Sequence, residues 1–128
     1  MPRRVLLIEN NDDHRRLLSI LLRDAGLVPV PAWNAEDGLA ILDDCACDLA
    51  VFDIQLPGMD GLDALSVVAE KLPRLPVVLV TASGDVREAH ARSLGAKGFL
   101  RKPFSASEFL DAVGAALDSG VGTPSPQR

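Results

Sequence analysis

The feature that most constrains this fold is an alternation of two kinds of apolar segment along the chain. Short, uninterrupted apolar runs occupy residues 5–8, 49–52 and 77–80, with weaker runs at 27–32 and 98–100. Runs of this length are typical of strands that are buried on both faces of a parallel sheet. In the longer segments between them, apolar residues recur every three or four positions, which is the spacing of one helix face. The sequence therefore predicts five strands that alternate with five helices.

Two prolines in the second run decide the order of the strands. Proline cannot donate a hydrogen bond to a neighbouring strand, so it is tolerated mainly at the edge of a sheet. The order 2-1-3-4-5 places Pro29 and Pro31 at an edge, whereas the order 3-2-1-4-5 places them in the interior. We therefore predict a single α/β domain, a flavodoxin-like doubly wound (βα)5 fold with a parallel sheet of order 2-1-3-4-5.

Polar residues mark the starts of three helices. Asn11 or Asp12 is expected to cap the first helix, and Asn34 the second. Ser105 is expected to cap the last helix, where Glu108 completes a capping box.

Length and composition limit the classes of function. The 128 residues suffice for one domain, which we assign to residues 1–118, with residues 119–128 as a flexible tail or the start of a linker. The formal net charge of -5 opposes general nucleic-acid binding, and no apolar run approaches the roughly 20 residues that span a bilayer. Cys45 and Cys47 lie too close together to staple a fold, and reduced thiols suit a cytoplasmic protein.

Polar residues follow four of the predicted strands. In an open parallel sheet, ligands bind beyond the carboxyl ends of the strands, at the point where the strand order reverses. The residues that reach this edge are Glu9, Asn10, Asp53, Thr81 and Lys102. Two carboxylates, an amide, a hydroxyl and an ammonium are therefore expected to converge from separate parts of the sequence.

This set of groups suits phosphoryl transfer to a carboxylate. Asp53 follows a buried run, and a rigidly held carboxylate can act as a nucleophile to form an aspartyl phosphate. Mg²⁺ is the natural hard cation for such a site. Lys102 would supply a second positive charge and the Thr81 hydroxyl a hydrogen-bond donor.

Four segments resemble the receiver domain of two-component response regulators, the CheY-like family. The resemblance covers residues 3 to about 118 and is carried by residues 5–11, 53–61, 76–82 and 95–104. It implies that Asp53 accepts a phosphoryl group from a histidine kinase or a small phosphodonor. It also implies that Glu9, Asp53 and the backbone carbonyl of Gln55 bind Mg²⁺, and that Thr81 and Lys102 contact the phosphoryl group.

The resemblance further implies a switch and partners. Ala82 joins the phosphoryl-contacting group, and Phe99 occupies the position of an aromatic residue that turns inward when the threonine moves. The peptide bond between Lys102 and Pro103 is expected to be cis. Upstream, the partner is a sensor histidine kinase or a phosphotransfer protein. Downstream, a target protein or a second copy would bind the face from Gly84 to Phe104, and a complete chain of this length would signal only through such contacts.

One position departs from the family pattern. The second residue of the family's acidic pair is Asn10 here, and an amide can coordinate Mg²⁺ but contributes no charge. Cation affinity depends on ligand charge, so we expect weakened metal binding. Asp12 and Asp13 lie close by, but their position favours helix capping and interaction with the helix dipole over metal binding.

These observations leave three functions open. The favoured one is a phosphorylatable receiver that catalyses only its own phosphoryl transfer and dephosphorylation. The alternative is a pseudo-receiver, a protein-binding module that signals without phosphorylation. The third is a flavodoxin-like enzyme domain, which is disfavoured because residues 9–13 contain no glycine to cradle a phosphate ester. No metal or phosphohistidine role is expected for His14 or His90.

Overall fold

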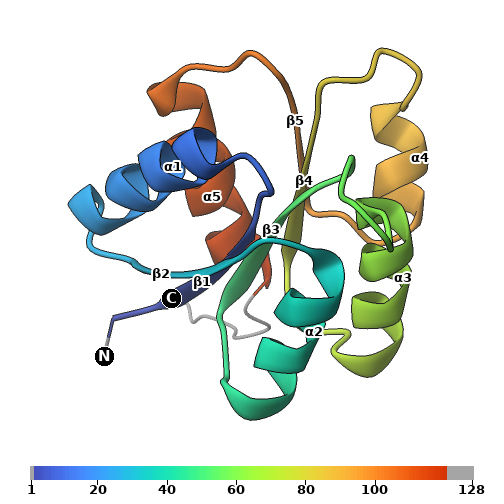
Figure 1. The fold of residues 1–128 in the computed structure, drawn as a ribbon, viewed down its shortest axis with the longest axis horizontal. Helices are drawn as coiled ribbons and strands as arrows, with labels where there is room; N and C mark the ends of the chain where they lie inside the picture. Colours follow the sequence, from blue (N-terminus) through green and yellow to red (C-terminus); the bar gives the residue numbers. More distant parts are fainter. Residues whose placement is uncertain (1, 121–128) are drawn as a thin grey trace.

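The computed structural model describes residues 2–120, which form one five-stranded parallel sheet between two layers of helices (Figure 1). The strands are β1 (Arg4–Ile8), β2 (Val28–Ala32), β3 (Leu49–Asp53), β4 (Val77–Thr81) and β5 (Gly98–Arg101). The helices are α1 (Asp12–Asp24), α2 (Ala35–Asp44), α3 (Gly61–Lys71), α4 (Glu88–Ser93) and α5 (Ala106–Gly120). Residues 119 and 120 thus belong to α5, and the remainder of the predicted tail, residues 121–128, lies outside the described residues.

The sheet has the order β2-β1-β3-β4-β5, which confirms the predicted topology. All four strand pairs are parallel. The strand β2 pairs only with β1, so Pro29 and Pro31 lie at the edge, as their missing N–H groups require. Among residues 2–120, no helix is both long and apolar enough to cross a membrane.

Successive residues of the central strands feed two separate cores. Leu6 and Ile8 pack in the cluster that α2, α3 and α4 cover. Val5 and Leu7 point to the opposite face and pack in the cluster that α1 and α5 cover. Figure 1 shows these two helix layers on either side of the sheet. Because the central strands are buried on both faces, their ends are held rigidly where the polar residues emerge.

The helix starts follow the predicted capping residues. Asn11, rather than Asp12, caps α1, since its Oδ1 accepts a hydrogen bond of 2.9 Å from the His14 N–H. Asn34 caps α2 in the same way. At the start of α5, Ser105 and Glu108 form the reciprocal capping box, with bonds of 2.8 and 3.0 Å.

The start of α3 lies unusually close to the end of β3. A Cβ added to Gly61 would lie 2.6 Å from the backbone oxygen of Asp53 and 2.6 Å from the Cα of Ile54. Both atoms belong to the backbone, which cannot turn aside as a flexible side chain can. Gly61 therefore allows α3 to pack directly against the residue that follows the sheet.

We expect Gly61→Ala to lower the free energy of unfolding by about 1–3 kcal/mol, because the added methyl group overpacks a backbone contact. The matched control is Gly114→Ala in α5, where an added Cβ would have no atom within 4 Å. That change should stabilise the protein by about 1 kcal/mol through helix propensity. Urea unfolding of both variants measures the contrast, and equal effects would contradict this account of Gly61.

Candidate functional site

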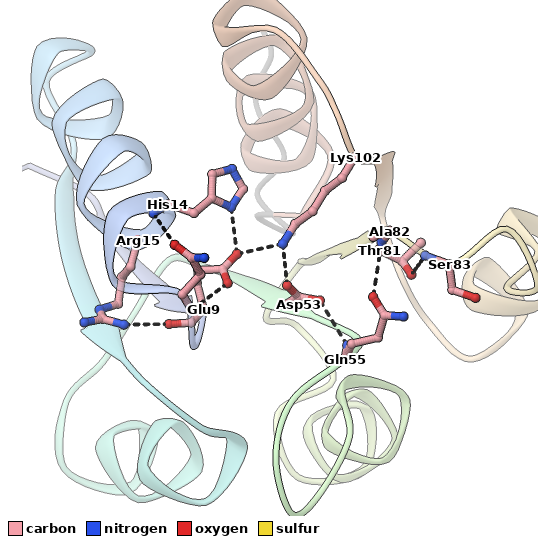
Figure 2. Close-up of polar contacts among 10 residues, drawn as sticks. Glu9, His14, Arg15, Asp53, Gln55, Thr81, Ala82, Ser83 and Lys102 are labelled. Atoms are coloured by element: carbon pink, nitrogen blue, oxygen red, sulfur yellow. Dashed lines mark hydrogen bonds and ion pairs between the residues drawn. The ribbon is translucent and has the colours of Figure 1, made fainter.

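The candidate site lies at the carboxyl ends of the strands, where the sheet order reverses (Figure 2). Glu9 follows β1, Asp53 ends β3, Thr81 ends β4 and Lys102 follows β5. Parallel strands bring their carboxyl ends to one edge, and the strand order places β1 beside β3. Residues far apart in the sequence are thereby brought together.

A single ammonium group joins two carboxylates at the centre of the site. Lys102 Nζ lies 2.6 Å from Asp53 Oδ2 and 3.0 Å from Glu9 Oε1. Both acids are buried, with 6% of Asp53 and 3% of Glu9 exposed. Buried carboxylates need a partner charge or hydrogen bonds to stay ionised. Lys102 supplies both, and the three groups together keep one net negative charge.

Glu9 has two further hydrogen-bond donors. The Asn11 N–H donates to Oε2 at 3.0 Å, and His14 Nδ1 lies 2.8 Å from Oε1. Burial raises the pKa of the Glu9 carboxyl, but the bonds from Asn11, His14 and Lys102, with the lysine charge, outweigh it and leave the pKa below its usual value. Glu9 is therefore held as a carboxylate.

Asp53 has fewer donors. The Gln55 N–H donates to Oδ1 at 3.0 Å, and Lys102 binds Oδ2. Burial raises the pKa of the Asp53 carboxyl, the bonds from Lys102 and Gln55 offset part of that, and the nearby Glu9 charge adds to the increase. For Lys102, burial lowers the pKa, but the bonds and charges of Asp53 and Glu9 raise it above the usual lysine value.

Two potential donors lie beside this cluster, at the end of β4. Thr81 is fully buried, and its Oγ1 accepts a bond of 2.9 Å from the Ser83 N–H. The Ala82 N–H donates to Gln55 Oε1 at 3.2 Å, so the glutamine side chain bridges the loops after β3 and β4. The spacing of polar residues along the sequence did not predict this hydrogen bond, because the bond depends on the orientation of the Gln55 side chain.

The remaining predicted site residues are Asn10, Phe99 and Pro103. Asn10 is exposed, and its side chain makes no hydrogen bond to any residue in the range 2–120. Phe99 is half-buried beneath the Arg101 guanidinium, whose carbon lies 5.2 Å from the ring centroid. The Lys102–Pro103 peptide bond is cis.

The two acids of the first helical turn, Asp12 and Asp13, lie at the N-terminus of α1. Asp12 is exposed and forms an ion pair of 2.7 Å with Arg15. Asp13 lies in the same turn of α1. Both carboxylates are placed to interact favourably with the helix dipole.

His14 and Arg15 also contact Glu9, and the sequence pattern did not predict either contact. Besides the contact of His14 with Glu9, Arg15 Nη1 donates to the Glu9 backbone carbonyl at 2.9 Å. The signal was present, because the α1 N-terminus begins three residues after Glu9, so its first turn must lie beside that residue.

Glu9 and Asp53 supply carboxylate oxygens, which are the ligands that a hard cation prefers. Mg²⁺ is usually bound by one or two carboxylates and keeps several waters. Glu9 and Asp53 are two buried carboxylates that both contact Lys102 Nζ, at 3.0 and 2.6 Å, so their oxygens lie close to each other. Within residues 2–120, no group of three or more His, Cys, Asp or Glu side chains is arranged to hold a metal ion. Glu9 and Asp53 are thus the two acidic side chains of the described residues at this site that could hold Mg²⁺.

Comparisons with known proteins agree on one family. The family model described as "Response regulator receiver domain" matches residues 5–114. The response regulator protein FleR of Pseudomonas aeruginosa is 40% identical over 114 residues, which are 88% of this chain and 24% of FleR. The chain thus spans about a quarter of the length of that relative.

Solved structures have the same fold. The receiver domain of NtrX from Brucella abortus is 32% identical, with a TM-score of 0.85, over 90% of this chain and 98% of that one. A CheY-like receiver domain protein from Methanospirillum hungatei has a TM-score of 0.88 over 94% of this chain and 97% of that one. It is 24% identical, so it supports the fold alone.

We expect Asp53→Asn to raise the midpoint of urea unfolding at neutral pH. Because the pKa of Asp53 is raised in the folded state, its ionised form costs folding free energy. That cost is present in full above the folded pKa and is absent below the ordinary value of 3.8. The gain from Asp53→Asn should therefore shrink as the pH is lowered toward that value.

The control for lost charge is Asp111→Asn, at an exposed position on α5. It should show no comparable gain at neutral pH. A lower midpoint for Asp53→Asn than for the wild type at neutral pH would contradict the stated cost of burying Asp53.

Proposed function

The chain belongs to the response regulator receiver family of two-component phosphorelay signalling, and on this premise we propose that Asp53 accepts a phosphoryl group. The observation that carries the proposal is the placement of Lys102 Nζ 2.6 Å from Asp53 and 3.0 Å from Glu9 at the sheet edge. An ionised carboxylate beside a positive charge is a nucleophile with charge compensation for an incoming phosphoryl group. The donor is a sensor histidine kinase, a phosphotransfer protein or a small phosphodonor.

The transfer is a displacement at phosphorus. One Asp53 oxygen forms a bond to phosphorus while the phosphorus–nitrogen bond of a phosphohistidine, or the phosphorus–oxygen bond of an acyl phosphate, breaks. The leaving group keeps the electron pair of the broken bond. Asp53 is well placed for this role because its other contacts, from Gln55 and Lys102, are hydrogen bonds that hold the carboxylate in one orientation.

Mg²⁺ would be held by Glu9, Asp53, the Asn10 amide oxygen and the Gln55 backbone carbonyl. When bound, it supplies charge that neutralises the phosphoryl oxygens. Lys102 adds a second positive charge, and its pairing with two carboxylates leaves it free to shift from one oxygen to another without leaving the site. The protein's own part is thus positioning and charge compensation.

The end of β4 supplies donors for the phosphoryl oxygens. A hydroxyl can accept and donate at once, so Thr81 can keep its bond from Ser83 and donate its own hydrogen. The Ala82 N–H becomes a second donor once it exchanges its bond with Gln55 Oε1. Both contacts would draw the loop after β4 toward Asp53.

Movement of that loop would be transmitted through Arg101 to the predicted partner-binding face, from Gly84 to Phe104. The Arg101 guanidinium binds the backbone carbonyls of Ser83 and Val86 and lies over the Phe99 ring. A shift of the loop therefore changes the support of Phe99 within the face from Gly84 to Phe104. A downstream protein or a second copy would bind there, and the domain would catalyse only its own phosphoryl transfer and dephosphorylation.

One observation favours a second function. Asn10 brings no charge, and Glu9 Oε1 is already bound by both His14 and Lys102, so two of the protein's own groups occupy an oxygen that a cation would need. A pseudo-receiver would keep this closed arrangement and bind its partner without phosphorylation.

Incubation with acetyl phosphate and Mg²⁺ should add the mass of one phosphoryl group to the intact protein. We expect Asp53→Asn to add none, because an amide is not a nucleophile for this transfer, and Asp63→Asn, exposed on α3, to behave as the wild type. Intact-mass spectrometry reads each sample. A folded wild-type protein that gains no mass, and does not respond to beryllofluoride, would favour the pseudo-receiver.

We expect Asn10→Asp to lower the Mg²⁺ concentration for half-maximal phosphorylation by about tenfold, because ligand charge sets affinity for hard cations. Asn34→Asp is the matched control, since that residue caps α2 on another element. Titration of the initial phosphorylation rate with Mg²⁺ measures the shift. An unchanged requirement would show that Asn10 does not limit cation binding.

A further inference from the structure

The Glu9 carboxylate has one oxygen shared by two donors. Oε1 contacts His14 Nδ1 at 2.8 Å and Lys102 Nζ at 3.0 Å, while Oε2 accepts from the Asn11 N–H at 3.0 Å. An ionised carboxylate can only accept, so His14 Nδ1 carries the hydrogen in this contact. Figure 2 shows the imidazole and the ammonium approaching the same oxygen from different elements.

The imidazole of His14 is fixed on its other side. Its ring lies 5.6 Å from the Phe104 ring, and Phe104 stacks on Phe109 at 5.9 Å with an interplanar angle of 17°. Phe109 is fully buried on α5. The backbone N–H of His14 is also held, by the Asn11 cap. A ring fixed by packing and by its backbone presents its N–H in one direction.

We infer that His14 is a positioning residue that holds the Glu9 carboxylate in place for cation binding at the phosphoacceptor site. The inference rests on the proposed function, in which Glu9 is a cation ligand and Lys102 moves toward the phosphoryl group. When Lys102 leaves Oε1, His14 stays as its partner, and the buried carboxylate is not left with the Asn11 N–H alone.

The identity of residue 10 makes this support more important. With Asn10 uncharged, Glu9 and Asp53 are the two carboxylates at the site, so the orientation of Glu9 decides much of the cation affinity. Hydrogen-bond partners of metal ligands typically change affinity or activity 10–100-fold when they are removed. His14 is such a partner for Glu9.

Two substitutions separate the N–H group from the ring. His14→Phe keeps a ring for packing on Phe104 but removes the donor. His14→Asn loses the ring but keeps an N–H at the same number of bonds from Cα as Nδ1. The matched control is His90→Phe, at an exposed position on α4.

The experiment measures binding of Mn²⁺ alone, by the electron paramagnetic resonance signal of the free ion, and phosphorylation by acetyl phosphate with Mg²⁺. We expect His14→Phe to weaken Mn²⁺ binding about tenfold, His14→Asn to restore most of it, and His90→Phe to leave it unchanged. Urea unfolding of each variant reports stability separately. A purely structural role would change stability and leave Mn²⁺ affinity the same.

The outcomes separate the two proposals. Equal Mn²⁺ affinity in the wild type and His14→Phe, or no restoration by His14→Asn, overturns the role of His14 while phosphorylation of the wild type upholds the proposed function. A wild type that binds Mn²⁺ in a His14-dependent way but takes no phosphoryl group upholds the role of His14 and overturns the proposed function. A wild type that does neither overturns both.

Discussion

The arrangement of the site depends on one ammonium group between two buried carboxylates. Lys102 meets Glu9 and Asp53 across 93 and 49 positions of sequence, so the contact ties β5 to β1 and β3 at their carboxyl ends. Without a positive charge between them, two buried acids at this distance would repel each other and neither would stay ionised without cost. The strand order 2-1-3-4-5 brings the two carboxylates to one edge of the sheet, and Lys102 compensates their charge there.

The pKa values of the two carboxyls that Lys102 contacts are displaced in opposite directions. Glu9 has donors on both oxygens from Asn11 and His14 as well as Lys102, and these overcome the effect of burial. Asp53 has the Gln55 N–H and Lys102, and burial prevails. A carboxylate with a lowered pKa suits a ligand that must remain charged, whereas one with a raised pKa keeps more electron density for bond formation. The number of donors thus distinguishes two similar acids.

The sequence predicted the fold better than the contacts of individual side chains. Pro29 and Pro31 revealed the sheet edge because the absence of an N–H is a property of the residue itself. Asp53 and Lys102 could be placed because Asp53 ends one strand and Lys102 directly follows another. His14 could not, since its contact with Glu9 depends on the rotation of α1 and on packing against Phe104 from α5. The Gln55–Ala82 bond likewise depends on a rotamer, which periodicity does not encode.

Gly61 gives the surroundings of Asp53 unequal stiffness. On the α3 side, the helix start packs directly against the backbone of Asp53 and Ile54, which leaves no space for a displacement in that direction. On the other side, a Cβ at Gly84 would meet nothing within 4 Å, and the six-residue α4 is preceded by Arg87, which makes no side-chain cap bond. Strain introduced at Asp53 would relax where resistance is lowest. Under the proposed function, a phosphoryl group on Asp53 would therefore displace the loop between β4 and α4 more readily than the start of α3.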